Sequence, residues 1–216
     1  TKMQSFLSVL PSVTEFGKAA LLPNHQLTYT EQTEVLVDGK KTKGLTNRRA
    51  VLQQRDANAA ALNYDDVVKM TKSEIREALN GKSIIYIYHD QVDRTGDHGN
   101  ESKVFDASES AINEIFRLIN RLHNDVSIYR FIVTADHGFL YRRSVMSEAE
   151  KIENPSQNEQ DRVERRFIIS DEEYDVVGTK TFSLGESLGN DDTRKICVPI
   201  TSSIFKKAVS YTHLTL

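Results

Sequence analysis

The middle of the chain has the clearest pattern of apolar and polar positions. Residues 71–74 (TKSE) have the spacing of a capping box, in which a Thr and a Glu three positions later close the first turn of a helix. This helix is expected to end at Asn80-Gly81. Residues 84–88 (IIYIY) are apolar without interruption, with β-branched and aromatic side chains. They predict a strand that is buried on both faces.

A long amphipathic helix is predicted next. Asp106 and Glu109 are expected to cap its amino end, and Asn124-Asp125 to end it. Its apolar side chains recur at the spacing of one helix face: Ile112, Ile115, Phe116, Ile119 and Leu122. A second short apolar run, residues 131–133 (FIV), follows this helix. Strand, helix and strand within about 50 residues form a βαβ unit, so the sequence predicts an α/β fold with a parallel sheet.

The flanking regions give weaker signals. Residues 14–22 are helix-like, and residues 27–47 contain a β-prone run at 33–37 with a turn at 38–40, which indicates a hairpin or an excursion. The basic run 39–44 is interpreted as a solvated loop, with a phosphate contact as the alternative. Residues 144–162 are expected to form a polar loop or an irregular helix, and residues 166–170 and 195–200 two further strands.

Composition narrows the class of protein. The 216 residues are 38% hydrophobic and 27% charged, with a formal net charge of -3, which is typical of a globular chain and argues against nucleic-acid binding by charge alone. Cys197 is the single cysteine, so no internal disulfide can form and a reducing compartment is expected. No apolar run reaches the roughly 18 residues of a membrane span, so the expected location is the cytoplasm, without membrane association.

Ionisable residues follow both predicted strands. The first strand leads into His89, Asp90, Asp93, Asp97 and His98, and the second leads into Asp136-His137. Functional groups in parallel sheets gather at the carboxyl ends of the strands, where these side chains would meet. So many carboxylates and imidazoles at one edge would repel one another without a cation, which predicts a site for one or two divalent metals. The alternative is an ordinary turn at residues 136–138 and a solvated loop around His98.

Thr14 is a candidate nucleophile. It follows Pro11 at the start of the predicted helix 14–22, where backbone N–H groups favour an anionic oxygen such as that of a phosphate. A metal ion would lower the pKa of its hydroxyl. The alternative is that Thr14 is a helix N-cap, for which Thr is a common residue.

Three ordered motifs resemble the PglZ family of the alkaline phosphatase superfamily, in particular the PglZ component of type 1 BREX phage-exclusion systems. They are residues 10–23 (LPSVTEFGKAALLP), residues 88–97 (YHDQVDRTGD) and residues 132–139 (IVTADHGF). The resemblance implies an α/β, alkaline-phosphatase-like sandwich with a mainly parallel sheet, truncated at both ends. Residues 1–207 are expected to be a partial PglZ domain, and residues 208–216 (AVSYTHLTL) a non-native tail, which removes His213 from the candidate ligands.

The resemblance also implies roles for individual residues. Thr14 would be the nucleophile and a ligand of one metal, which Asp136 and His137 would also bind. Asp93 would bind a second metal with Asp97, and His98 competes with Asp97 for that role. Zinc is the usual ion of the family, and manganese or magnesium would suit the carboxylate-rich second site. The family pattern further includes an aspartate upstream of the nucleophile and a last histidine, neither of which this chain supplies outside the tail.

The function implied is metal-dependent hydrolysis of a phosphoester, by in-line attack of Thr14 and hydrolysis of the phosphothreonine that results. The substrate class includes nucleotides and nucleic acids, and the implied partners are other BREX proteins. A sulfatase is excluded, because it needs a formylglycine precursor, usually Cys, at the position of Thr14. The alternative function is a non-catalytic, metal-binding assembly module of the defence complex.

Overall fold

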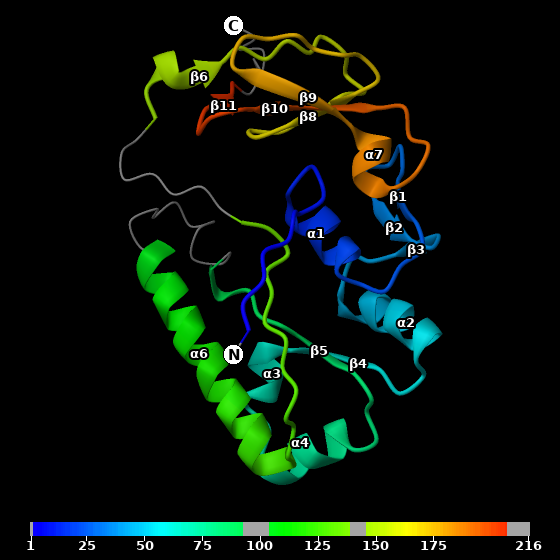
Figure 1. Cartoon of the computed structure of the whole chain (residues 1–216), viewed down its shortest axis with the longest axis vertical. Coiled ribbons are helices and arrows are strands. Elements are labelled where there is room, and N and C mark those ends of the chain that lie inside the picture. Colours follow the sequence, from blue (N-terminus) through cyan, green and yellow to red (C-terminus); the bar gives the residue numbers. More distant parts are fainter. Residues whose placement is uncertain (1, 93–103, 139–145, 207–216) are drawn as a thin grey trace, which may run out of the picture.

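The computed structural model describes residues 2–92, 104–138 and 146–206 (Figure 1). Near its amino end, helix α1 (Thr14–Ala20) precedes a three-stranded antiparallel sheet of β1 (Leu27–Tyr29), β2 (Val35–Val37) and β3 (Lys40–Lys41). Strands β2 and β3 are joined by Asp38 and Gly39, both with positive φ angles of 48° and 77°. This tight connection confirms the hairpin that the sequence indicated.

A parallel pair of strands follows. Helix α2 (Leu45–Arg55) leads to β4 (Ala60–Asn63), which pairs in parallel with β5 (Ile85–Tyr88), from Ala60 opposite Ile85 to Asn63 opposite Tyr88. Between these strands lie α3 (Tyr64–Val67) and α4 (Lys72–Leu79). The predicted capping box is present at α4: Glu74 N donates to Thr71 Oγ1 at 3.3 Å, and Thr71 N donates to Glu74 Oε2 at 2.6 Å.

The predicted βαβ unit is correct in its first strand and its helix, and wrong in its second strand. Helix α6 (Val104–Val126) begins before its predicted caps, so Asp106 lies in its first turn. Residues 131–133 form no strand, and β5 pairs with β4 instead. All four residues of β5 are half-buried, because among the described residues β4 is its one neighbour; the prediction of a strand buried on both faces was wrong.

The carboxyl-terminal part is an antiparallel sheet with the order β7-β8-β10-β9. Its strands are β7 (Arg162–Val163), β8 (Ile168–Ser170), β9 (Thr179–Ser183) and β10 (Lys195–Pro199), and α7 (Leu184–Leu188) follows β9. The 3₁₀ helix η2 (Glu148–Glu150) leads into β6 (Lys151–Ile152), which pairs in parallel with β11 (Ile204–Phe205). The chain is therefore a mixed α/β protein, but the expected mainly parallel sheet is not what the described residues form.

One hydrophobic core contains residues from both the amino-terminal and the carboxyl-terminal parts of the chain. Phe16 of α1, Val37 of β2, Leu52 of α2 and Ile196 of β10 are all buried in it, and α1 lies between the carboxyl-terminal sheet and the β4–β5 pair (Figure 1). A second cluster holds α4 and α6 together through Ile75, Leu118 and Leu122. None of the helices in the described part of the chain is long and apolar enough to cross a bilayer.

Candidate active site at Thr14 and His137

Thr14 is the first residue of α1, and its hydroxyl faces a side chain far away in the sequence. Thr14 Oγ1 lies 3.0 Å from His137 Nε2, across 123 residues of chain. The N-cap of α1 is Val13, and no side chain caps the helix. The interpretation of Thr14 as an N-cap is therefore wrong, and its half-buried hydroxyl is directed at an imidazole instead.

The hydrogen bonds of His137 fix its tautomer. Nδ1 lies 2.8 Å from the backbone oxygen of Gly138, and a carbonyl oxygen can only accept a hydrogen bond. Nδ1 therefore carries the proton, and in the neutral ring Nε2 has a free electron pair. The Thr14 hydroxyl donates to this nitrogen, so His137 presents the atom that a metal ion or a proton would take.

Asp136, next to His137 in the chain, has one carboxylate oxygen without a hydrogen-bond partner among the described residues. Its Oδ1 accepts a hydrogen bond of 3.2 Å from the backbone N–H of His137. Its Oδ2 is buried and has no hydrogen-bond partner among the described residues. A buried carboxylate oxygen without a donor is costly, and a cation would relieve that cost. A carboxylate oxygen and a neutral imidazole nitrogen are donors that suit zinc or manganese, so the residues present fit a metal ion.

A glycine lets the helix approach this segment closely. A Cβ on Gly17 would lie 2.1 Å from the backbone oxygen of Asp136 and 2.7 Å from its carbonyl carbon, so no other residue fits at this position without a shift. Ser8 Oγ also donates to the same oxygen of Asp136 at 3.5 Å. The contact of Gly17 with Asp136 sets how near α1 comes to His137, and so supports the Thr14–His137 distance.

Two further contacts hold α1 in place. Arg162 of β7 binds Glu15 with both terminal nitrogens, at 2.7 Å and 3.1 Å. Burial alone would lower the pKa of Arg162, but the hydrogen bonds with Glu15 and Tyr29 outweigh it and raise that pKa above its ordinary value. Before α1, Leu10 N donates to Ser187 Oγ at 2.6 Å, and the same hydroxyl donates to Leu10 O at 2.9 Å. Thr14 thus lies at the start of a helix that is held by contacts with β7 and α7.

The carboxyl end of β5 carries the other predicted cluster. His89 Nε2 lies 2.7 Å from Glu114 Oε2 of α6, and the His89 ring packs edge-on against Tyr64 with centroids 4.6 Å apart. His89 therefore joins the end of β5 to α6. Asp93, Asp97 and His98 lie outside the described residues, and within the described ranges no three His, Cys, Asp or Glu side chains form a metal-binding group.

Tyr88, the last residue of β5, precedes His89, and its ring contacts the guanidinium of Arg48. The Arg48 guanidinium lies 4.1 Å from the centroid of the Tyr88 ring. The Tyr88 hydroxyl and Arg48 Nε are both buried without a hydrogen-bond partner among the described residues. Burial raises the pKa of Tyr88 to about 12, and the charge of Arg48 opposes this only in part. Tyr88 is therefore neutral at every physiological pH.

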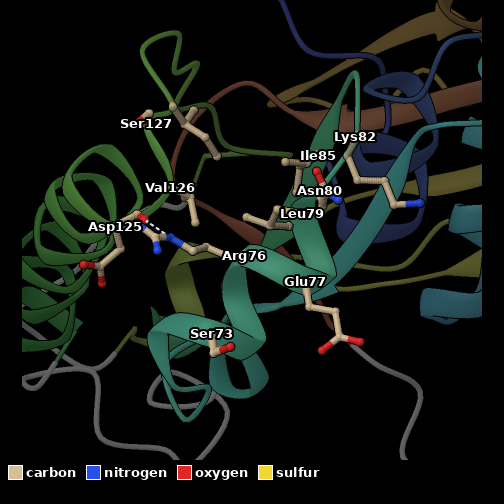
Figure 2. A pocket seen from close by; sticks show the side chains of 12 residues that line it. Ser73, Arg76, Glu77, Leu79, Asn80, Lys82, Ile85, Asp125, Val126 and Ser127 are labelled. Carbon is tan, nitrogen blue, oxygen red and sulfur yellow. Dashed lines mark hydrogen bonds between the residues drawn. The ribbon is translucent and has the colours of Figure 1, made fainter.

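A hollow of about 740 Å³ lies at the other end of β5 and is separate from the Thr14–His137 contact. It is lined by α4, the start of β5 and the end of α6, and Arg76 Nε donates there to Asp125 O at 2.8 Å (Figure 2). Its lining includes Ile85, the first residue of β5. His89 follows Tyr88, the last residue of β5, so it lies at the opposite end of the strand. It contains none of the predicted site residues.

The comparisons with known proteins agree with these motifs. A family model described as "BREX system PglZ alkaline phosphatase-like domain" matches residues 1–214. The chain belongs to the PglZ family. It is 36% identical over 200 residues to the alkaline phosphatase-like protein PglZ of Bacillus cereus (strain H3081.97), covering 92% of this chain. It is 34% identical over 177 residues to the alkaline phosphatase-like protein BrxZ of Escherichia coli O9:H4 (strain HS), covering 78% of it.

These relatives are much longer than the segment that matches. The chain spans 23% of the Bacillus cereus protein and 20% of the Escherichia coli protein. No solved structure matches this PglZ-family chain at a significant level. The family resemblance inferred from three motifs is therefore confirmed, and the fold is supported at the level of a mixed α/β protein of an alkaline-phosphatase-like family.

Sequence reasoning on this PglZ-family chain missed three supporting contacts. The contact of Gly17 with Asp136 could have been expected, because a glycine inside a helical pattern often marks a close backbone approach. The pairing of His89 with Glu114 was partly indicated by the sequence, since both residues belong to the predicted βα unit. The ion pair of Arg162 with Glu15 joins positions 147 residues apart, and nothing local in either segment indicates it.

Proposed function

We propose that this chain forms part of a metal-dependent phosphoester hydrolase of a BREX system, with Thr14 as the nucleophile. The observation that carries the proposal is the 3.0 Å contact of Thr14 Oγ1 with His137 Nε2. It joins the hydroxyl of the first family motif to the imidazole of the third. Membership of an alkaline-phosphatase-like family supports the same chemistry, as well as the sandwich fold of that superfamily.

The chain's own donors suit one cation beside Thr14. Asp136 Oδ2 is buried without a partner among the described residues, and His137 Nε2 carries no proton and faces the Thr14 hydroxyl. We assign both residues, with Thr14, to the first metal, and Asp93 with Asp97 or His98 to a second one. A bound divalent ion supplies positive charge that lowers the pKa of a hydroxyl and stabilises the oxygens of a phosphoryl group. Zinc is the first choice, and manganese and magnesium are the alternatives.

The proposed reaction has two steps, phosphoryl transfer to Thr14 and hydrolysis of the phosphothreonine. Thr14 gives its hydroxyl proton to solvent, and its oxygen attacks phosphorus in line with the leaving alkoxide. An O–P bond to Thr14 forms as the ester O–P bond breaks, and the leaving alkoxide takes a proton from solvent. Water then cleaves the phosphothreonine and restores the hydroxyl. Gly17 and the Arg162–Glu15 pair keep Thr14 placed against His137 during both steps.

Family membership supports a proposal for the substrate, the partners and the location. We propose a phosphoester substrate, with nucleotides and nucleic acids as the first classes to test, and other BREX proteins as partners. The cytoplasm is the proposed location, since phage exclusion acts inside the cell. A non-catalytic assembly module is the second candidate, because within the described ranges no three His, Cys, Asp or Glu side chains form a metal-binding group and only His137 contacts Thr14 Oγ1.

The test uses a reading frame of the relatives' length that includes this chain. Hydrolysis of an aryl phosphomonoester and an aryl phosphodiester is measured with zinc, manganese or EDTA. We expect metal-dependent turnover that falls by a factor of about 1,000 or more in Thr14→Ala. The matched control is Ser12→Ala, which removes an exposed hydroxyl two residues away and should leave turnover unchanged.

Two results would contradict the proposal. Equal turnover in Thr14→Ala and wild type would show that Thr14 is not the nucleophile. Binding of zinc or manganese without hydrolysis of any phosphoester would favour the assembly module.

A further inference from the structure

Residues 39–55 form a basic stretch in an acidic chain. They contain six Lys and Arg residues and no Asp or Glu, whereas the whole chain has 28 basic and 31 acidic residues. This stretch therefore carries a formal charge of +6 and the rest of the chain one of -9, which together give the net charge of -3. Charge that is divided in this way creates a local positive potential on an acidic protein.

The fold brings the basic residues together at the surface. Strand β3 and helix α2 are in contact and lie side by side (Figure 1). Arg48 is half-buried, and the other five side chains are exposed: Lys40, Lys41, Lys43, Arg49 and Arg55. The first turn of α2 contains no acidic residue. The partial positive charge at the start of a helix therefore adds to that of the side chains.

Two of the six charges have carboxylate partners. Lys41 pairs with Glu34 at 2.9 Å. Arg55 pairs with Asp38 at 3.7 Å. The other four have no carboxylate partner within the described ranges, and we call them the basic surface: Lys40, Lys43, Arg48 and Arg49.

Helix α2 directs this surface to one end of the β4–β5 pair. In the second half of α2, Gln53 Nε2 donates to Ala59 O, just before β4, at 3.3 Å. In the first half, Arg49 Nη2 donates to Ala61 O, inside β4, at 2.9 Å. The helix therefore runs antiparallel to β4, and its first residues lie toward the carboxyl end of that strand.

Arg48 has the same placement relative to β5. Its guanidinium lies 4.1 Å from the ring centroid of Tyr88, the last residue of β5. Because β4 and β5 are parallel, their carboxyl ends lie at one edge. The family motif of residues 88–97 begins at this edge. The basic surface and a motif of the proposed hydrolase therefore lie at the same edge.

We propose that the basic surface binds the phosphate backbone of a nucleic acid, which is the substrate of the proposed hydrolase. Only the identification of this nucleic acid as the substrate rests on the proposed function; the binding itself does not. Lys and Arg contact phosphates through an ammonium charge or a guanidinium fork. The rest of the chain, with its charge of -9, repels a polyanion, so contact is confined to this surface and the strand is led to the edge that carries the motif.

The number of charges determines the expected salt dependence. Each phosphate contact with a single strand releases counterions and contributes about -0.7 to the slope of log K against log salt concentration. The four side chains of the basic surface therefore predict a slope of about -3. At about 0.1 M salt, each contact strengthens binding about fivefold.

Fluorescence anisotropy with a labelled single-stranded oligonucleotide tests the binding. The protein is a reading frame of the relatives' length that includes this chain, with Thr14→Ala and EDTA to prevent hydrolysis. Lys40→Gln with Lys43→Gln should weaken binding at least about 10-fold at about 0.1 M salt and make the slope less steep by about 1.4. The matched control is Lys69→Gln with Lys82→Gln, two exposed side chains outside the basic surface, and it should change neither quantity.

A hydrolysis assay separates this proposal from the proposed function. With Thr14 intact, Lys40→Gln with Lys43→Gln should raise KM for an oligonucleotide about 10-fold at unchanged kcat. The same variant should hydrolyse an aryl phosphodiester as fast as the wild type. If the wild type hydrolyses no phosphoester, the proposed function fails, whereas a loss of oligonucleotide binding in the variant still supports the basic surface.

Two outcomes would overturn the proposal. One is that Lys40→Gln with Lys43→Gln leaves both the affinity for the oligonucleotide and its salt slope unchanged. The other is displacement of the oligonucleotide by poly-glutamate at an equal concentration of charge, which would make an acidic polypeptide the occupant.

Discussion

Replacing Gly17 by Ala should damage the candidate site more than it damages the fold. The added Cβ would lie 2.1 Å from Asp136 O, 2.7 Å from Asp136 C and 3.0 Å from Asp136 Cβ. Ordinary contacts need about 3.5 Å, so the helix and the Asp136 backbone must separate by about 1 Å or more. Overpacking of this kind costs about 1–3 kcal/mol, and the better helix propensity of Ala returns about 1 kcal/mol. The net loss of stability is therefore at most about 2 kcal/mol.

The displacement falls on the site itself. In the described part of the chain, no backbone–backbone hydrogen bond holds residues 129–135, so we expect the strain to be relieved by moving Asp136 and His137 away from α1. A misplacement of about 1 Å can cost about 100-fold in rate. Gly17→Ala should therefore reduce phosphoester hydrolysis about 100-fold, while its unfolding temperature falls by only a few degrees.

The matched control is Ala20→Gly in the last turn of the same helix. It weakens α1 by about 1 kcal/mol without a clash, so it should lose comparable stability and keep its rate. Thermal unfolding and hydrolysis are measured on both variants in the longer reading frame. A Gly17→Ala protein that hydrolyses as fast as the wild type would refute the role of this close approach.

Two other perturbations test the contacts around the site. Arg162→Lys keeps the charge but loses the two-point contact with Glu15. Because Glu15 is half exposed, the free energy of unfolding in urea should fall by about 1 kcal/mol or less; a clearly larger fall would contradict this. Burial raises the pKa of Tyr88 to about 12, so its contribution to stability is complete below its unfolded pKa of about 10 and is lost between pH 10 and 12. Tyr88→Phe should remove both the change in tyrosine absorbance near pH 12 and this loss of stability. If the absorbance change near pH 12 persists in the variant, another tyrosine titrates there.

The parts of the fold that depend on local chemistry could be predicted from the sequence. The capping box of Thr71 and Glu74, the hairpin turn at Asp38-Gly39 and the extent of β5 all rest on residues close together in the chain. The partner of β5 could not be predicted in this way, because pairing depends on which other segment is available. Ala60–Asn63 is a short run without β-branched residues, and it was not recognised as a strand.

In the candidate site, too, some features could be predicted from the sequence and others could not. The expectation that Thr14 and His137 lie together came from the family motifs and from the rule that strand ends gather at one sheet edge. The two side chains do lie together, although residues 131–133 form no strand. A different feature brings them together: the close approach of Gly17 to Asp136, which depends on the absence of a side chain. The roles predicted for Asp93, Asp97 and His98 stay predictions, because these residues lie outside the described ranges.

The central claim is that Thr14 attacks phosphorus, and the most direct measurement is the location of phosphate on the protein during turnover. The longer reading frame is mixed with a phosphoester and zinc, quenched in acid within one turnover, digested and examined by mass spectrometry. The account predicts phosphate on the peptide that contains Thr14, at Thr14 itself, with none in Thr14→Ala. Hydrolysis at full rate with no phosphate on this peptide, or with phosphate on Ser12, would contradict it.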